Sequence, residues 1–150
     1  MKNKYSKDEI NLKNQKKILK EHLYHRKEII FVYIYGSYAR KTNNNLSDLD
    51  IAIYVENKNF DSGAFGYRSE LIATLSSLLK IEVDLIILND VSNFLAYNVL
   101  KDGYLIFCKS ETKRKEFHYN IMSKYLDFLP AKKVQDDYLN KRINSNKYGR

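Results

Sequence analysis

One stretch constrains this chain more than any other: residues 30–55, which read IFVYIYGSYARKTNNNLSDLDIAIYV. Residues 29–35 are apolar on both faces, which predicts a strand that is covered on both sides. Gly36-Ser37 then ends this strand and begins a short helix, and a polar loop follows. Residues 48–55 alternate in polarity, which predicts a second strand. The stretch therefore predicts a compact unit of strand, turn, helix and strand.

Two carboxylates stand at the start of the second strand. Asp48 and Asp50 are two positions apart, so their side chains point the same way, roughly 6.5–7 Å apart along the strand. Carboxylates so placed can hold Mg²⁺, a hard ion that prefers oxygen ligands. A third carboxylate on a neighbouring strand would allow two metal ions roughly 4 Å apart. Asp84 is the candidate, because its strand is otherwise apolar around it, and Glu82 on the same face is the reserve.

The Gly36-Ser37 turn predicts a phosphate site. Glycine can adopt a positive φ and lets the backbone approach a phosphate closely. Serine can offer its hydroxyl and N–H at a helix start, where the dipole favours anions. A triphosphate site beside a metal site is equipment for phosphoryl or nucleotidyl transfer, and the chain has no GxxxxGK[ST] pattern of a P-loop enzyme. The alternative is a plain turn with solvated carboxylates, or an ion-paired Asp84.

The rest of the chain predicts an α/β (α+β) fold, a single domain over residues 1–150 with a mixed β-sheet flanked by helices. The first two strands are joined by too little chain to cross over, which favours a mixed sheet. Pro130 is expected to end a helix, and a further helix is expected from Ala131. Apolar periodicity and capping predict helices over residues 7–27, 64–80, 91–101 and 111–129, and strands over 81–88 and 104–108.

Composition limits the setting. Cys108 is the one cysteine, which excludes an internal disulfide, and its apolar surroundings indicate a small buried hydrophobe. No apolar stretch reaches membrane-spanning length and the N-terminus lacks a signal-peptide segment, so no membrane partner and a cytoplasmic location are expected.

The charge is divided along the chain. Residues 1–28 hold nine basic and four acidic residues, residues 29–108 hold six and nine, and residues 109–150 hold eleven and five. Basic ends can attract nucleic acid, although the abundance of lysine, asparagine, isoleucine and tyrosine is a pattern that an AT-rich genome also produces. The acidic middle suits metal ions better than phosphate backbones.

At this point the residues resemble a known family. The run YGSYARKTNNNLSDLDI over residues 35–51 resembles the GS-x10-D-x-D signature of the DNA polymerase β-like nucleotidyltransferase superfamily. The short chain and the VDLIIL around Asp84 resemble the minimal nucleotidyltransferases. The stretch from Phe94 to the basic helix with Arg114 and Phe117 resembles the antitoxin branch, whose members pair with HEPN-domain RNase toxins.

This resemblance implies an enzyme that uses ATP and two Mg²⁺ ions. Members of the antitoxin branch transfer AMP to a tyrosine of the cognate HEPN toxin, so the expected partner is that toxin in a hetero-oligomer, and nucleic acid is not required. Carried over by position, Gly36 and Ser37 would bind the triphosphate. Asp48 and Asp50 would bind both metals, and Asp84 would hold the catalytic metal and act as base on the attacking hydroxyl.

Five residues in three parts of the chain have roles that the sequence leaves open. Arg40 would contact phosphates or form a structural ion pair. Lys41 stands where the family usually has glycine, which puts the geometry of the loop in doubt but not the carboxylates. Arg114, Lys115 and Phe117 are interpreted as a solvated or partner-facing helix face. Two other functions also remain open: a non-catalytic antitoxin that works by covering its partner, and a nucleotidyltransferase that acts on RNA ends or a small molecule.

Overall fold

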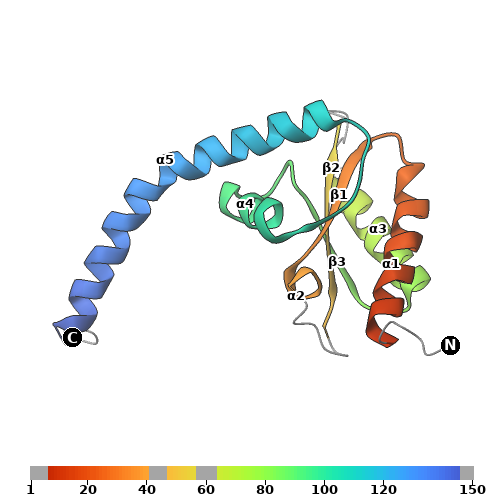
Figure 1. The fold of residues 1–150 in the computed structure, drawn as a ribbon, viewed down its shortest axis with the longest axis horizontal. Coiled ribbons are helices and arrows are strands. Elements are labelled where there is room, and N and C mark those ends of the chain that lie inside the picture. The colour runs from red at the N-terminus through yellow and green to blue at the C-terminus, as the bar shows by residue number, and fades with distance from the viewer. Residues whose placement is uncertain (1–6, 41–46, 57–63, 146–150) are drawn as a thin grey trace.

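The computed structural model describes residues 7–40, 47–56 and 64–145, over which helices and strands follow the predicted order (Figure 1). The helix α1 ends at Tyr24 rather than at residue 27, because the next residues form a turn in which the Ile29 N–H donates to the Arg26 carbonyl at 3.2 Å. The elements are α1 (Lys7–Tyr24), β1 (Ile29–Tyr35), α2 (Gly36–Ala39), β2 (Leu49–Val55), α3 (Ala64–Leu79), β3 (Val83–Ile87), α4 (Asn93–Asp102), β4 (Tyr104–Cys108) and α5 (Glu111–Asn144).

The four strands form one sheet in the order β3-β2-β1-β4. β1 runs antiparallel to both β2 and β4, whereas β2 and β3 are parallel. The predicted mixed sheet is therefore confirmed. The parallel pair is the one whose strands are joined through a full helix, α3, as a crossover connection requires.

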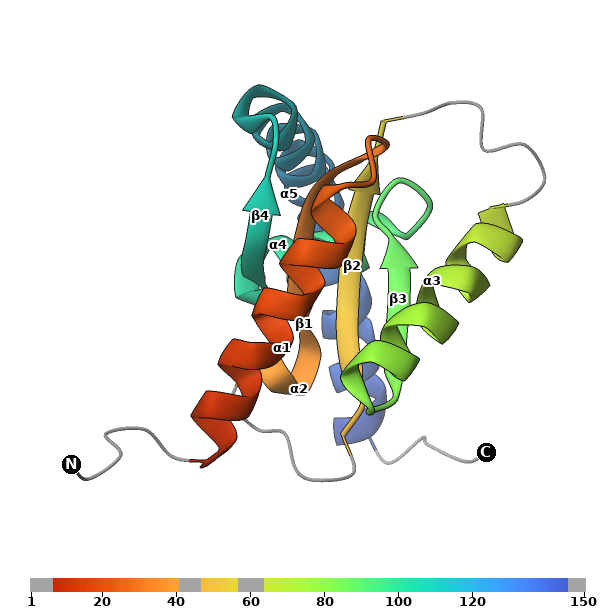
Figure 2. The same cartoon turned by 90° about the vertical axis from the view of Figure 1, so that its right-hand side faces the viewer.

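Alternation along the strands divides the core into two layers. Figure 2 shows α1 and α3 on one face of the sheet, with α4 and α5 behind it. On the first face the odd-numbered residues of β2 pack with α1 and α3. On the second face Ala52 and Tyr54 pack with α4 and α5. Buried on the first face are Leu19, Leu23, Leu49, Ile51, Ile53, Leu71, Leu75 and Leu85; buried on the second are Ile30, Phe31, Ala96, Val99 and Ile121.

The predicted helix stop at Pro130 is wrong. α5 continues through Pro130 as a single helix of 34 residues. Proline removes one backbone hydrogen bond and its ring crowds the carbonyl four residues earlier, so it bends a helix where it does not end it. Figure 1 shows α5 arching away from the body after its first turns.

The start of α5 corrects a second expectation. Arg114 donates to the Tyr33 hydroxyl at 3.1 Å and pairs with Glu111 at 2.7 Å. Phe117 packs with Phe31, their ring centroids 5.9 Å apart. Both side chains therefore fasten α5 to the sheet instead of facing a partner. Cys108 is half-buried beside them, in keeping with its predicted packing role.

Within the described residues, no helix is both long and apolar enough to cross a membrane.

Candidate active site

Three residues from three strands form a row on the face of the sheet that α4 covers. Tyr35 of β1 lies directly opposite Asp50 of β2, and Asp50 lies directly opposite Asp84 of β3. Residues paired across neighbouring strands point to the same face, so their side chains are neighbours. Asp48 lies just before β2, two positions from Asp50. The sheet thus brings Asp84 beside Asp50, although the two residues are far apart in sequence.

The turn after β1 fits tightly against this row. Gly36 has φ +69°, which is the left-handed region that favours glycine. A Cβ at this position would collide with the Asp50 carboxylate and lie 3.1 Å from its Cγ. Ser37 follows at the start of α2 and is half-buried. The predicted phosphate turn therefore lies directly against a predicted metal ligand, and only glycine permits that approach.

Asp84 is held by an arginine that the sequence analysis missed. Arg68 of α3 donates from Nη2 to Asp84 Oδ1 at 3.0 Å and from Nε to the Leu85 carbonyl. The Leu85 N–H also donates to Asp84 Oδ1, at 2.9 Å. Because both bonds within the described structure fall on Oδ1, Asp84 Oδ2 is the oxygen left for a metal or a proton. The signal was present: Arg68 shares the buried face of α3 with Leu71 and Leu75.

The ion-paired state of Asp84 was one of the alternatives for that residue. The pair with Arg68 does not exclude a functional role, because the arginine fixes one carboxylate oxygen and leaves the other. Glu82, the reserve, is exposed and lies just before β3, where its backbone carbonyl accepts from the Leu49 N–H at 2.9 Å.

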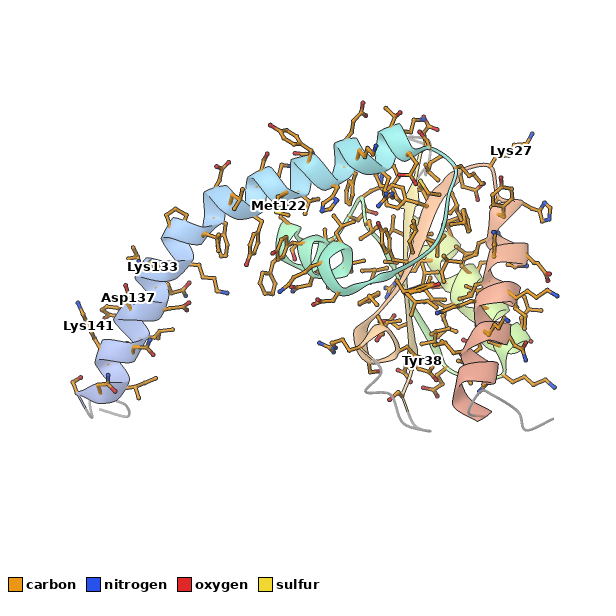
Figure 3. The ribbon with its side chains drawn as sticks, in the orientation of Figure 1. Lys27, Tyr38, Met122, Lys133, Asp137 and Lys141 are labelled. Carbon is orange, nitrogen blue, oxygen red and sulfur yellow. The ribbon has the colours of Figure 1, made fainter. Side chains whose placement is uncertain are left out.

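The negative charges of this site oppose the ionisation of Asp50 and of two nearby tyrosines. Burial, then the charges of Asp84 and Asp48, raise the pKa of Asp50, and the nearby Arg40 opposes this. Burial and the charges of Asp50 and Asp84 raise the pKa of Tyr35 to about 12. Burial and the charge of Asp48 raise the pKa of Tyr38, a residue of α2 that Figure 3 labels at the same end of the sheet. A bound cation would relieve this repulsion.

The carboxylate groups of this site are the type of ligand that a hard divalent cation binds. Carboxylate oxygens at a partly exposed edge are the ligands that Mg²⁺ prefers, together with water and phosphate. In the described ranges, no three acidic, histidine or cysteine side chains converge closely enough to enclose an ion as they stand. Asp48 is exposed, so substrate phosphates and a small side-chain movement would have to complete such a site. Lys41, whose role was in doubt, lies outside the described residues.

The pattern of the family described as "Polymerase beta, Nucleotidyltransferase" matches residues 16–112, which include the turn, the three carboxylates and the whole sheet. The chain belongs to this family. The resemblance predicted from the GS-x10-D-x-D signature is confirmed, and so are the fold class and the nucleotidyltransferase class of enzyme.

Two relatives have names that specify the reaction further. A protein of Methanocaldococcus jannaschii named "Putative protein adenylyltransferase MJ1379" is 34% identical over 82 residues, 55% of this chain and 76% of that protein. The protein adenylyltransferase MntA of Shewanella oneidensis is 33% identical over 90 residues. That match covers 60% of this chain and 62% of MntA, which is less than two thirds of the relative.

Solved structures show the same architecture over most of the chain. A chain of a toxin-antitoxin crystal structure with AMP-PNP is 28% identical, with a TM-score of 0.69, and the likeness covers 84% of this chain and 98% of that chain. A complex of a tri-AMPylated HEPN toxin with its MNT antitoxin, from Shewanella oneidensis, contains a chain with a TM-score of 0.64 at 24% identity, which compares the fold alone. That match covers 86% of this chain and 98% of that chain.

Proposed function

We propose that this protein is an antitoxin that transfers AMP from ATP to a tyrosine of a cognate HEPN RNase toxin. The observation that supports this most directly is the contact of the Gly36 turn with Asp50, next to Asp84 in the neighbouring strand. This brings a turn suited to phosphates against carboxylates suited to metal ions. The names of the adenylyltransferase relatives and the toxin-antitoxin structures support the choice of ATP and of a toxin as acceptor.

Each residue of the site would have a distinct task. Gly36 and Ser37 would bind the triphosphate, with Arg40 adding positive charge beside it. Asp48 and Asp50 would hold two Mg²⁺ ions, and Asp84 would share the one nearest the reaction. When bound, Mg²⁺ supplies positive charge that stabilises the charge developing on the phosphates.

The transfer itself needs one nucleophile and one base. The tyrosine oxygen attacks the α-phosphorus of ATP, and a P–O bond to tyrosine forms as the bond to the bridging oxygen of the β-phosphate breaks. Pyrophosphate leaves. The phenolic proton passes to Asp84, where Oδ2 is the oxygen not engaged by Arg68 or the Leu85 N–H. Arg68 thereby keeps the accepting oxygen in a fixed orientation.

Mass spectrometry of the partner tests this directly. The protein is incubated with ATP, Mg²⁺ and a candidate HEPN toxin as partner, and we expect the partner to gain AMP on a tyrosine. Asp48→Ala should abolish the gain while leaving the fold intact. If the partner gains no mass and Asp48→Ala still neutralises it, the protein works by covering its partner. If tRNA or another RNA becomes labelled from radiolabelled ATP and the partner does not, the acceptor is RNA.

A further inference from the structure

A second charged feature lies on the opposite side of the sheet, between α1 and β4. A groove of about 520 Å³ runs between the two elements. β4 is an edge strand, because the sheet order ends with it. In Figure 2 the N-terminal half of α1 passes beside the start of β4. The groove is lined chiefly by Lys13, Lys16, Lys17 and Lys20 of α1 and by Tyr104 and Leu105 of β4.

The groove is strongly positive. Its lining contains four lysines and no acidic residue. Lys17 lies 3.9 Å from Glu21, but both side chains are so exposed that water screens the pair. Across the described part of the chain, Lys13 and Lys20 take part in no salt bridge. Lys13 and Lys20 are seven residues apart on one helix, about 10 Å along its axis, a distance that about three stacked nucleotides span.

An exposed tyrosine ring lies near each end of β4, next to a lysine. Tyr104 is 51% exposed, and the ammonium of Lys16 lies 3.4 Å from the centre of its ring. At the other end of β4, Lys109 lies 5.1 Å from the ring centre of Tyr24, another exposed aromatic. Each end of the strand thus presents a ring next to a positive charge. Proteins bind single-stranded nucleic acid with this combination, because bases stack on rings and phosphates meet cations.

Protection of the sheet edge explains the groove less well. Lysines beside an edge strand discourage pairing with another chain. That role would be served by charge alone, and exposed tyrosines would work against it because they add apolar surface. Tyr24 packs edge-on against Phe107, with the ring centroids 5.3 Å apart, but the ring of Tyr104 needs a different explanation.

We propose that the α1–β4 groove binds single-stranded nucleic acid, with Lys13, Lys16 and Lys20 on the phosphates and Tyr104 stacked on a base. The groove is separate from the carboxylates: α1 packs on the face of Leu49 and Ile51, whereas Asp50 points to the other face. Binding there goes beyond the proposed transfer to a toxin and does not depend on it. Transfer activity and nucleic-acid binding can therefore be lost independently.

Fluorescence anisotropy of the full chain with a labelled oligouridylate of roughly 12 nucleotides tests the proposal. The triple variant Lys13→Gln, Lys16→Gln, Lys20→Gln should bind at least about tenfold more weakly, and the slope of log K against log salt should fall by about two. The matched control is Lys124→Gln, Lys133→Gln, Lys141→Gln on exposed positions of α5. Figure 3 shows Lys133 and Lys141 on the part of α5 that lies away from the body, and this control should bind nearly as the wild type does.

A second pair of variants tests stacking without changing charge. Tyr104→Ala should weaken binding about five- to a hundredfold, whereas Tyr104→Phe should keep it, because the ring is retained. Oligoglutamate of equal charge should compete poorly. The proposal is overturned if the oligonucleotide does not bind, if groove and control variants lose equal affinity, if Tyr104→Ala binds normally, or if oligoglutamate competes equally well. Thermal denaturation of each variant checks that the fold is retained.

Discussion

The carboxylate row, by which we mean Asp48, Asp50 and Asp84, and the lysine groove lie on opposite sides of one sheet. The two differ in how much they destabilise the fold. Asp50 and Asp84 are neighbours and partly buried, and burial together with the charges of Asp84 and Asp48 opposes the ionisation of Asp50. The lysines of α1 project from the side of the helix that faces away from the core, where water and salt screen their repulsion. A cluster of like charges that destabilises the fold needs a functional explanation, whereas a cluster of exposed lysines can follow from composition alone. The carboxylates are therefore the stronger sign of function.

The largest expected effect that tests this comparison is the loss of AMP transfer when a carboxylate is replaced. Asp50→Asn keeps the size of the side chain but removes its negative charge, so the site loses one of the proposed metal ligands. We expect the rate of AMP transfer to fall about a thousandfold or more, since the metal contributes several kcal/mol to such reactions. The rate is measured from the mass gain of the partner at saturating ATP.

Asp90→Asn is the matched control for that variant. Asp90 is exposed in the turn after β3 and is not part of the row, so its loss should leave the rate unchanged. Comparable losses in both variants would mean that net charge, and not the row, supports transfer. The triple lysine variant of the groove should also transfer AMP at the wild-type rate to a toxin partner.

The next effect concerns the turn that contacts Asp50. Gly36→Ala places a methyl group against the Asp50 carboxylate and at a φ that alanine adopts only with strain. We expect the free energy of unfolding to fall by about 1–3 kcal/mol and transfer to fall about a hundredfold. Thermal denaturation and transfer rates measure the two effects.

A second glycine offers a control with the opposite sign. Gly66 lies exposed in α3, and a Cβ there meets nothing within 4 Å. Gly66→Ala should stabilise the protein by about 0.5–1 kcal/mol and leave transfer unchanged. A Gly36→Ala variant that behaved like Gly66→Ala would show that the close approach to Asp50 has no role.

The sequence alone predicted the parts of this molecule that have short-range signals. Strand alternation placed Asp50 and Asp84 on the correct faces, because a period of two is read directly from neighbouring residues. The mixed sheet followed from the length of one loop. The GS-x10-D-x-D spacing predicted which residues would meet, and the sheet register then brought Asp84 opposite Asp50.

The errors came from contacts that depend on tertiary packing. Arg68 was overlooked because an arginine in a helix is ordinary until Asp84 is known to lie beside it. Arg114 and Phe117 were expected to face outward, but Tyr33 and Phe31 draw them onto the sheet. Pro130 was expected to end a helix, but a bend allows the helix to continue.

Arg68 provides a smaller test of how the row is supported. Arg68→Gln removes the charge that orients Asp84 but leaves all three carboxylates in place. We expect the affinity for Mg²⁺ to fall by about 10- to 100-fold, and the rate of transfer to fall to a similar extent. The Mg²⁺ concentration that gives half of the thermal stabilisation measures affinity without reference to activity. Arg68→Lys should recover only part of it, because lysine cannot bond Asp84 and the Leu85 carbonyl together.

The smallest expected effect tests whether the carboxylates lower the stability of the folded protein. The pKa of Asp50 is raised in the folded protein, so the folded state holds this proton more tightly than the unfolded state does. Stability should therefore be lost as pH rises from the ordinary value of 3.8 through the raised folded value, and should then level off. Asp50→Asn lacks this loss, so its Tm should match the wild type in acid and exceed it by about 1–3 °C near neutral pH.

Mg²⁺ should reverse that order, because it stabilises the wild type and leaves Asp50→Asn nearly unchanged. The groove variant keeps every carboxyl group, so its Tm should follow the pH dependence of the wild type. If Asp50→Asn followed that same dependence without Mg²⁺, the row would cost the fold no more than the lysines do. The two sides of the sheet would then differ in their chemistry but not in their effect on stability. Destabilisation by the carboxylates would no longer be an argument for their function.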